Sequence, residues 1–479
     1  MSLLWPFLLP IATSLLSVFL KGRLLTGINL LSSFALLILA MQLLFEVVST
    51  GSVSVVFGDW PVPYGIEFYA DGLSALLVLL IALVSAVVMV FMVSWEKTAE
   101  TPSYFALMQC LVASVIAVSL AADLFNLYVW FELMLIAVLG LMVAGKGSRH
   151  TEAALKYFAV SMIGTLIMLS AIGMIHGAAG HLNFNALSQI AASDDAGNSL
   201  SLYGGMLLLA VLLKIGAFPL FAWLPAAYHA LPAPMLALVG GLLTKIAVYV
   251  LMRISGQVLD YQLFHEAIGW LAVITMLSGV LGAAYHWDLR RILSFHIVSQ
   301  VGFLMLGLAL ASPAGMTGTA FFLFHNILVK ANLFLIAGMV WMTAGHYDLR
   351  KIGGLYPSKQ LLTIIFLLSA LSLVGVPPTS GFWGKLLIIM ETFTQERYLW
   401  AAAALITGML TLYSMSKIWV EGFWKPHPGE PINTSIPVSI YVVMLLLSAI
   451  ILLMGLIPGP LIDFLQQQQW PQSNQGGVL

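Results

Sequence analysis

Long runs of apolar residues, separated by short polar stretches, follow one another along all 479 residues of the chain. A helix needs about 20 mainly apolar residues to span the hydrocarbon core of a bilayer, whereas a strand of a membrane barrel shows a shorter, alternating pattern. The pattern therefore predicts an all-α polytopic membrane protein with about 14 transmembrane helices. The runs lie near residues 2–20, 24–49, 72–95, 102–121, 124–144, 151–176, 201–230, 233–255, 264–285, 289–311, 315–344, 360–395, 399–424 and 435–461.

The composition excludes most other classes of protein. Residues of the AVILMFWYC set make up 61% of the chain and charged residues only 8%, against roughly 25% charge in soluble domains. Soluble enzymes, disordered chains and nucleic-acid-binding proteins are therefore excluded. The single cysteine, Cys110, excludes an intrachain disulfide and a cysteine-based metal cluster. Since the sequence also lacks a haem ligand pair, a phosphate-binding loop and a flavin fingerprint, we expect no catalytic residue, no cofactor and no metal.

The loop charges predict an orientation, because Lys and Arg are enriched in cytoplasmic loops. Connections after odd-numbered runs hold eleven such residues, and those after even-numbered runs hold two, Arg253 and Arg397. The odd connections are therefore expected in the cytoplasm and both termini outside. The eleven residues are Lys21, Arg23, Lys97, Lys146, Arg149, Arg290, Arg291, Arg350, Lys351, Lys359 and Lys425.

Six further lysines lie inside the predicted spans. Lys156 and Lys417 lie close enough to the cytoplasmic end for the ammonium to reach the headgroups by snorkelling. The other four lie near the midplane, where a charge costs at least about 2.5 to 3.5 kcal/mol. We therefore expect a functional role for these four, which are Lys214, Lys245, Lys330 and Lys385.

Glu132 is the acid that matches these lysines in depth. It lies nine residues beyond Asp123, which is roughly 13 Å along a helix, and Asp123 is expected to cap the helix start. A Glu/Lys pair in a dry bundle can change between its charged and neutral forms when one more proton or cation arrives. Such a pair is what a proton relay requires.

Two of the predicted spans are interrupted by glycine and proline. The first reads LKIGAFP over residues 213–219 and the second reads LVGVPPTSGFWGK over residues 373–385. Each proline removes the hydrogen bond to the carbonyl four residues earlier, and in lipid a freed carbonyl must face protein or a wet cavity. The carbonyls so freed are those of Ile215, Leu373 and Val374. The residues expected to break the two helices are Gly216, Pro219, Gly375, Pro377 and Pro378.

The two breaks also indicate an internal repeat. Gly216 and Pro219 recur, with the same separation between them, as Gly375 and Pro378. The interval from the first pair to the second carries one five-helix unit onto the next, and because five is odd the second copy is inverted in the membrane. We expect one transmembrane domain, residues 1–479, with inverted repeats at 102–255 and 262–425. Inverted repeats with discontinuous helices are typical of ion and substrate transporters.

Two histidines lie within predicted spans, His296 and His325. Histidine titrates near neutrality and can pass protons. A helical histidine can equally serve as a satisfied hydrogen-bonding partner between helices. The sequence leaves both interpretations open.

Several strings resemble the antiporter-like subunits shared by respiratory complex I, membrane hydrogenases and Mrp-type cation/proton antiporters. They are DLFNLYVWFELM (123–134), LKIGAFPLFAWLPAAYHALPAP (213–234), HNILVKANLFL (325–335) and GVPPTSGFWGK (375–385), together with the Lys245 helix. The resemblance implies fourteen helices with two inverted five-helix repeats. It also implies a proton relay that begins at Glu132 in helix five and continues through lysines in helices seven, eight, eleven and twelve. These lysines match Lys214, Lys245, Lys330 and Lys385. To these the position of His325 and His296 within the spans adds two further candidates for the relay.

Within that family, the stretch GDWPVPYGIEFYADGLSALL (58–77) resembles the D-type subunit of Mrp antiporters. This implies a proton-translocating subunit of a multisubunit Na+/H+ antiporter, a transporter subunit and not an enzyme. Its partners would be Mrp subunits of the A, B, C, E, F and G types, in a bacterial cell membrane.

Two other functions remain open at this point. The chain could be a proton-pumping subunit of an NADH:quinone oxidoreductase or of a membrane-bound hydrogenase. A free-standing carrier is disfavoured, because a sodium carrier should hold its own carboxylate-rich site, and Glu132 is the one acid placed near the midplane.

Overall fold

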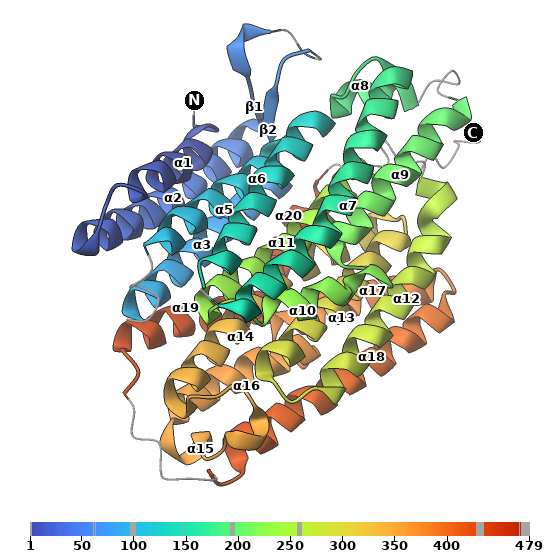
Figure 1. Cartoon of the computed structure of the whole chain (residues 1–479). Coiled ribbons are helices and arrows are strands. Elements are labelled where there is room, and N and C mark those ends of the chain that lie inside the picture. Colours follow the sequence, from blue (N-terminus) through green and yellow to red (C-terminus); the bar gives the residue numbers. More distant parts are fainter. Residues whose placement is uncertain are drawn as a thin grey trace.

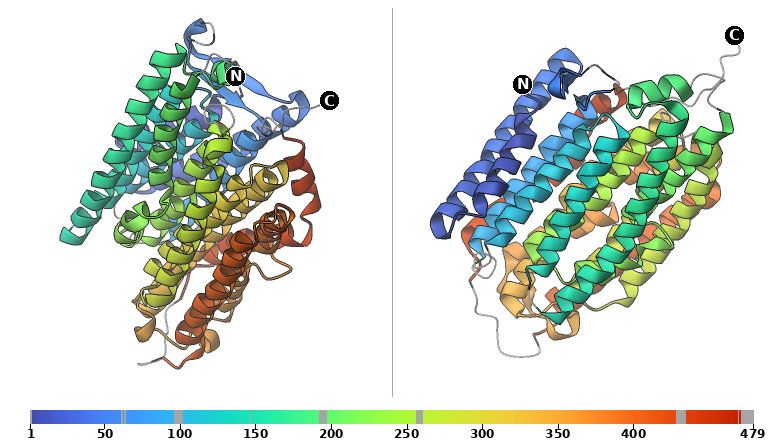
Figure 2. Two further views of the ribbon diagram at one scale, coloured as in Figure 1. Left: turned by 90° about the vertical axis from the view of Figure 1, so that its right-hand side faces the viewer. Right: turned by 45° about the horizontal axis from the view of Figure 1, so that its top comes forward.

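The computed structural model of the chain describes residues 2–60, 62, 64–95, 102–145, 147–191, 197–255, 261–427, 435–468 and 470. Two of the loop cations, Lys97 and Lys146, lie outside these residues. Long helices lie side by side in one tilted bundle (Figure 1, Figure 2). Of the described helices, twelve are long and apolar enough to cross a membrane, so the chain is a multi-pass membrane protein.

Two of the predicted runs contain shorter helices. The first run forms α1 (Trp5–Ser17), of 13 residues. The twelfth forms α16 (Gln360–Val374) and α17 (Ser380–Thr394), each of 15 residues, with a break between them. None of the three has the 18 residues that mark the other spans.

The N-terminal edge of the bundle consists of α1, α2 (Gly22–Thr50) and α3 (Gly72–Ser94). Between α2 and α3, strands β1 (Val53–Val56) and β2 (Glu67–Ala70) form an antiparallel pair with Val53 opposite Ala70. The pair extends from the upper end of the bundle in Figure 1. Four-residue strands are too short to show in a pattern of long apolar runs, so that pattern predicts no strand in this segment.

The remaining elements follow in chain order. The middle of the chain forms α5 (Ser103–Leu120), α6 (Leu124–Val143), α7 (Ser148–Ala179), α8 (Phe184–Ala191), α9 (Gly197–Ile215), η3 (Leu220–Ala222), α10 (Trp223–Tyr228) and α11 (Ala233–Ile254). The last part forms α12 (Tyr261–Tyr285), α13 (Leu289–Ala309), α14 (Pro313–Ala344), η4 (Leu349–Lys351), α15 (Leu355–Ser358), α16, α17, α18 (Tyr398–Ile418), the π-helical η5 (Trp419–Trp424), α19 (Val438–Leu456) and α20 (Gly459–Gln466).

Three helices, α11, α13 and α14, form the centre of the bundle. They are buried along most of their length and pack against one another, whereas α2 and α7 bury only one side. A helix that is apolar all round is expected in such a core. The centre therefore holds Lys245 on α11, His296 on α13, and His325 and Lys330 on α14.

The same backbone arrangement supports the starts of α6 and α13. A β-bridge joins Asp123 to Asn183 and another joins Asp288 to Asp348. Asp123 accepts a hydrogen bond from Asn126 N at 2.7 Å, and Asp288 accepts one from Arg290 N at 3.0 Å. The expected cap at Asp123 is thus confirmed. Both partners of the first bridge recur in the second after the same interval along the chain.

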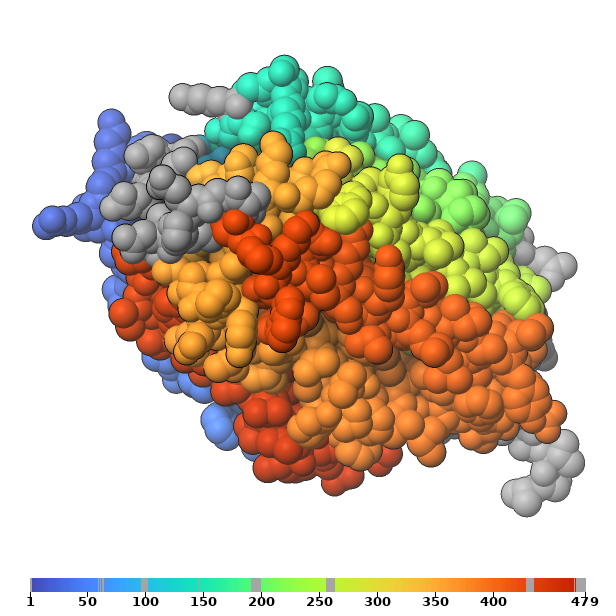
Figure 3. Space-filling model, turned by 90° about the horizontal axis from the view of Figure 1, so that it is seen from below, coloured from blue at the N-terminus to red at the C-terminus, as the bar shows by residue number. Residues whose placement is uncertain are grey.

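The described segments that carry the loop cations lie at one end of the bundle. The start of α7, the α12–α13 connection and the segment from η4 to α15 all reach the lower end in Figure 1. Seen from below, segments near residues 150, 290, 350 and 420 lie next to one another on this face (Figure 3). The charge pattern of the sequence therefore corresponds to one face of the molecule, called the basic end below.

At the opposite end, Asp71 joins α3 to α11. Its carboxylate accepts a hydrogen bond from Ser74 N at 2.9 Å, which caps α3. Arg253 Nη1 donates to Asp71 Oδ2 at 2.6 Å and Nη2 donates to Oδ1. Burial alone would raise the pKa of Asp71, but the Arg253 guanidinium outweighs burial and lowers it to about 2.

We predict that Asp71→Asn destabilises the protein by about 3 kcal/mol, because breaking a largely buried pair leaves the guanidinium uncompensated. The measurement is the midpoint of thermal unfolding in detergent, with the exposed Asp463→Asn as control. Because the pKa of Asp71 is lowered on folding, its contribution is full above the unfolded value, about 3.9. It is lost only as the pH falls toward the folded value, about 2. The difference between variant and wild type should therefore stay constant from about pH 8 to about pH 5, and a difference that shrinks in this range would contradict the assignment.

Candidate functional site

The first helix break ends α9 directly after Lys214 and Ile215. Gly216 has φ +78°, a conformation that side chains with a Cβ rarely adopt. Gly216 N and Ala217 N both donate to the carbonyl of Leu212 at 3.1 Å. The chain then continues through η3 into α10, so Lys214 lies in the last turn of α9.

The second break, between α16 and α17, has the same backbone hydrogen bonds. Gly375 has φ +93°. Gly375 N and Val376 N both donate to the carbonyl of Leu371 at 3.0 Å. Each of these three residues follows its counterpart in the first break by the same number of residues. Each break also contains a cis peptide bond, Phe218–Pro219 in the first and Pro377–Pro378 in the second.

Glu132 and Lys214 are linked through a threonine hydroxyl. Thr165 Oγ1, on α7, donates to Glu132 Oε1 at 2.7 Å. The same oxygen accepts a hydrogen bond from Lys214 Nζ at 3.3 Å. The hydroxyl therefore lies between an acid on α6 and an amine on α9. A hydroxyl donates one proton and accepts others, so it can join an acid to an amine in either charge state.

The surroundings of Lys214 combine an aromatic face with a small cavity. Lys214 Nζ lies 4.9 Å from the centroid of the Phe131 ring. A cavity of about 20 Å³ adjoins the lysine, lined also by Tyr157, Trp223 and Leu243. A cavity of this size exceeds the roughly 10–15 Å³ that one water needs. The amine can therefore reach water in addition to the threonine.

Lys385 binds the carbonyls that the second break sets free. Its Nζ donates to Leu373 O at 2.9 Å and to Val374 O at 2.8 Å. It also lies 4.8 Å from the centroid of the Phe303 ring. The break thus provides hydrogen-bond acceptors for the lysine, and the lysine provides the donor that the freed carbonyls lack.

Lys245 and Lys330 are completely buried between α11, α13 and α14. Lys245 Nζ donates to the carbonyl of Gly240 in its own helix at 2.8 Å. Lys330 Nζ lies 3.5 Å from the carbonyl of Leu293, which is the outer limit of a hydrogen bond. Of the four lysines, Lys330 has the weakest hydrogen bond.

Both candidate histidines bind serines on neighbouring helices. His325 Nδ1 lies 2.8 Å from Ser380 Oγ at the start of α17. His296 Nε2 lies 3.0 Å from Ser414 Oγ on α18. In each ring the second nitrogen is buried and has no partner among the described residues. The interhelical hydrogen bonds that the sequence left open therefore exist, and one nitrogen of each ring remains available to water.

The predicted relay residues form two groups. Lys330 interacts electrostatically with Lys245 and Lys385, and both histidines interact with Lys330 and Lys385. Lys214, in contrast, interacts with Glu132, Thr165 and Phe131. A direct contact between Lys214 and Lys245 is not seen within the described ranges. Leu243, on the same helix as Lys245, lines the cavity beside Lys214.

Polar atoms without a protein partner accompany the second group. Buried polar groups are normally hydrogen-bonded, and such atoms are where buried water binds. In the described part of the bundle, the side chains with such atoms next to the lysines and histidines are Thr244, Ser299, Gln300 and Asn326. These side chains place unpartnered polar atoms within α11, α13 and α14.

The sequence does not predict the hydroxyl groups that bind the candidate residues, nor the carbonyl acceptors of Lys417. Thr165, Ser380 and Ser414 are common residues in apolar helices, and no spacing in the sequence marks them as partners of charged groups. Lys417 was expected to reach the headgroups, but its Nζ donates to Ala284 O at 3.0 Å and to His286 O at 2.6 Å. It thus binds the carbonyls at the end of α12.

In the described part of the chain, no three or more His, Cys, Asp or Glu side chains are grouped so that they could hold a metal ion.

A family model described as NADH:quinone oxidoreductase/Mrp antiporter, TM, matches residues 121–411. The chain belongs to this family. The matched region of the NADH:quinone oxidoreductase/Mrp antiporter family includes all seven candidate relay residues and both helix breaks.

Two relatives are named as D-type subunits of Na+/H+ antiporters. The one from Alkalihalophilus pseudofirmus is 36% identical over 441 residues, covering 89% of this chain and 88% of the relative. The one from Bacillus subtilis is 33% identical over 431 residues, covering 89% and 87%.

Two solved structures of the NADH:quinone oxidoreductase/Mrp antiporter fold are similar over nearly the whole chain. A chain of the Mrp complex from Dietzia sp. has a TM-score of 0.90 at 28% identity, covering 97% of this chain and 96% of that one. A chain of respiratory complex I from Thermus thermophilus has a TM-score of 0.87 at 24% identity, covering 97% of each. The second similarity concerns the fold alone.

Proposed function

We propose that the chain is the proton-translocating subunit of a multisubunit Na+/H+ antiporter in a bacterial cell membrane. The observation that carries the proposal is the link from Glu132 through Thr165 to Lys214 beside a helix break. The names of the two relatives, D-type subunits of Na+/H+ antiporters, supply the type of antiporter. The partners are then the other Mrp subunits, of the A, B, C, E, F and G types, and the transported ions are H+ and Na+.

The relay operates by charge repulsion between neighbouring amines. A proton enters near the break between α9 and α10 and reaches Lys214, whose charge is balanced by Glu132 through Thr165. From there it moves through water and polar side chains to Lys245. Because Lys330 interacts with both Lys245 and Lys385, a charge that arrives at one lysine disfavours a charge on the next.

The exit lies at the second break. Lys385 is held there by the carbonyls of Leu373 and Val374. His325 bonds Ser380 at the start of α17, and His296 bonds Ser414 on α18. The second nitrogen of each histidine can exchange a proton with water and so assist the transfer.

Glu132 lies at the side of the bundle and is suited to couple this chain to a neighbouring subunit. It is only half-buried on α6, although its carboxylate is bound to the buried Thr165. A cation or a charged side chain of a partner that approaches Glu132 changes the field at Lys214. Sodium movement elsewhere in the complex can therefore act on the first amine of the relay.

The two halves of the relay form inverted repeats, residues 102–255 and 262–425, in this proposal. Supporting it, the hydrogen bonds from Gly216 N and Ala217 N to Leu212 O have counterparts from Gly375 N and Val376 N to Leu371 O. The bridges that support α6 and α13 recur in the same order along the chain. By the rule for loop cations, the basic end faces the cytoplasm and both termini lie outside.

A redox-driven proton pump is the second candidate function. The matching family includes NADH:quinone oxidoreductases, and the fold is similar to a chain of respiratory complex I. The same relay would then be driven by electron transfer in partner subunits.

We predict that Glu132→Gln and Lys214→Ala each lower Na+/H+ antiport by about 100-fold or more, the scale of losing a positioned acid or base. The measurement is cation-dependent dissipation of a pH gradient in everted vesicles, with the amount of assembled complex determined in parallel. Glu266→Gln removes an exposed acid that pairs with Arg397 and serves as control. Unchanged antiport in either relay variant would refute the mechanism.

We predict that Thr165→Val lowers antiport about tenfold, because a hydrogen bond to a charged group contributes about 1.5–3 kcal/mol. Valine keeps the shape of threonine but lacks the hydroxyl. Thr165→Ser restores the hydroxyl and should retain most of the activity in the same vesicle assay. The matched control is Thr407→Val, a buried threonine that bonds only a carbonyl of its own helix. Equal loss in the serine and valine variants would indicate a packing role instead.

We predict that the complex purified by a tag on this chain contains the other membrane subunits of the antiporter and no flavin or iron–sulfur protein. Mass spectrometry and the visible absorption spectrum of the native complex measure this. Flavin and iron–sulfur subunits in stoichiometric amounts would assign the chain to the redox-driven pump.

A further inference from the structure

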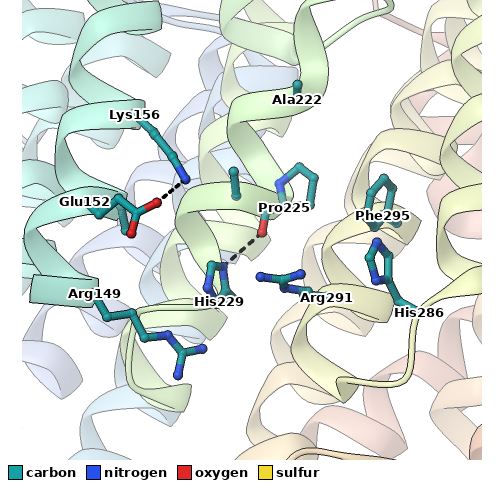
Figure 4. A pocket seen from close by; sticks show the side chains of 11 residues that line it. Arg149, Glu152, Lys156, Ala222, Pro225, His229, His286, Arg291 and Phe295 are labelled. Atoms are coloured by element: carbon teal, nitrogen blue, oxygen red, sulfur yellow. Dashed lines mark hydrogen bonds and ion pairs between the residues drawn. The ribbon is translucent and has the colours of Figure 1, made fainter.

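A second polar site lies at the basic end of the bundle, apart from the relay. It is a pocket of about 460 Å³ between α7, α10 and the α12–α13 connection. Figure 4 shows its lining, with the side chains of Arg149 and Arg291 approaching the space from α7 and α13. His229, which follows α10, lies between them in the same view. None of these residues has a part in the relay.

The fixed charges of this pocket are mainly positive. Arg149, Lys156 and Arg291 line it, and Glu152 is the acid in its lining. Glu152 pairs with Lys156. Neither arginine forms an ion pair within 4 Å in the described part of the chain. Two exposed guanidinium groups thus line the pocket with no ion-pair partner within 4 Å in the described part of the chain, and Asp288 acts on Arg149 only from farther away.

The elements packed around the pocket add little negative charge. Asp288 binds Arg290 at 3.4 Å, and Arg290 also lies 3.8 Å from the centroid of the Tyr347 ring. From α18, Lys417 contributes another cation next to His286. The charge of Asp288 is therefore partly balanced by Arg290. The cations that line the pocket, with Lys417 nearby, still outnumber the acids.

Two histidines in the lining respond to this potential. Burial, together with Arg291 and Arg149, lowers the pKa of His229 to about 4. Burial, Arg291 and Lys417 also lower the pKa of His286. His229 Nδ1 lies 3.1 Å from Pro225 O, which leaves Nε2 free for a ligand. A bound anion would offset the repulsion and favour the protonated form of both rings.

We propose that this pocket binds a phosphate group, the charged part of an anionic phospholipid or free phosphate. Guanidinium groups bind phosphate oxygens through paired, charge-assisted hydrogen bonds. The volume, about 460 Å³, lies in the range of small-molecule sites, about 300–1,000 Å³, and has room for a phosphate with its ester groups.

The position of the pocket favours the lipid as the source of the phosphate. Arg149 and Lys156 are seven residues apart on α7, so the cations extend roughly 10 Å inward from the end of that helix. Leu155 and Tyr285, the neighbours in sequence of Lys156 and His286, are 62% and 79% exposed. These side chains offer acyl chains an apolar surface beside the pocket. Basic pockets between transmembrane helices at this depth suit anionic headgroups.

The test measures lipid binding to the intact complex that contains the full-length chain. Native mass spectrometry follows titration with phosphatidylglycerol, with phosphatidylcholine as the zwitterionic comparison and inorganic phosphate as competitor. The double variant Arg149→Gln/Arg291→Gln should weaken phosphatidylglycerol binding about tenfold or more, because each lost charge-assisted contact is worth up to about that factor. Arg23→Gln removes an exposed cation of the α1–α2 connection and should change binding by less than about twofold.

A second pair of variants separates charge from folding. Arg149→Lys and Arg291→Lys keep the positive charge but lose the paired guanidinium bonds, so they should bind more weakly than wild type and more tightly than the double glutamine variant. Binding in the wild type should strengthen as the pH falls from about 6.5, the ordinary pKa of histidine, toward about 4, the pKa of His229 without the anion, since a bound anion raises the pKa of that ring. In His229→Gln/His286→Gln this pH dependence should disappear.

Each outcome decides for or against the site. If inorganic phosphate displaces the lipid from the wild type, and the double glutamine variant binds neither, the pocket binds the phosphate group of both the lipid and free phosphate. Binding of phosphate without the lipid identifies free phosphate as the ligand. Equal binding of phosphatidylcholine, an equal effect of Arg23→Gln, or full binding by the double variant would overturn the proposal. Because the readout is binding, failure here leaves the antiport experiments unaffected.

Discussion

The constraint on which this structure depends is that an amine buried in a bundle of helices needs oxygen acceptors, and a regular helix has few to offer. Each carbonyl inside a helix already accepts a hydrogen bond from the residue four positions later. The second break removes this competition at Leu373 and Val374, and Lys385 binds both carbonyls. The glycine, the prolines and the lysine are therefore one structural unit. Without the break, Lys385 would lack acceptors, and without Lys385 the freed carbonyls would lie unpaired in an apolar environment.

The four lysines meet the same requirement in four different ways. Lys214 shares the Thr165 hydroxyl with an acid, and Lys245 uses a carbonyl of its own helix. Lys330 has a single carbonyl at 3.5 Å, whereas Lys385 has two, at 2.9 and 2.8 Å. Lys330, which interacts with both Lys245 and Lys385, thus has the poorest hydrogen-bond acceptor of the four lysines. Lys330 has the weakest hydrogen bond and two cationic neighbours, so a change in charge at either neighbour acts on the group least held in place.

The sequence predicted the parts of this design that follow from length and from unusual residue types. Apolar runs of about 20 residues, charges inside them, and glycine–proline pairs near lysines are strong signals because each violates what an ordinary membrane helix tolerates. The cap at Asp123 follows from one residue type at a helix start. Thr165, Ser380 and Ser414 could not be predicted, since a hydroxyl in an apolar helix carries no pattern and its partner is set by packing. The same holds for Lys417, whose acceptors, Ala284 O and His286 O, lie at the end of another helix far away in the sequence.

The two ends of the bundle differ in the sign of their buried charge, and this difference bears on proton movement. Near the starts of α3 and α6, buried carboxylates predominate. Burial raises the pKa of Asp123 to about 6, and repulsion from Glu67 adds to it, although hydrogen bonds from backbone amides oppose the shift. At the basic end, burial and the arginines around His229 keep the ring neutral. Asp123 can therefore take up or release a proton near neutral pH at one end, while the fixed cations at the other end disfavour the protonated form of His229. An anion bound in the pocket between α7 and α13 would offset this positive charge, so the proposed phosphate site would change the charge of the basic end without touching the relay lysines.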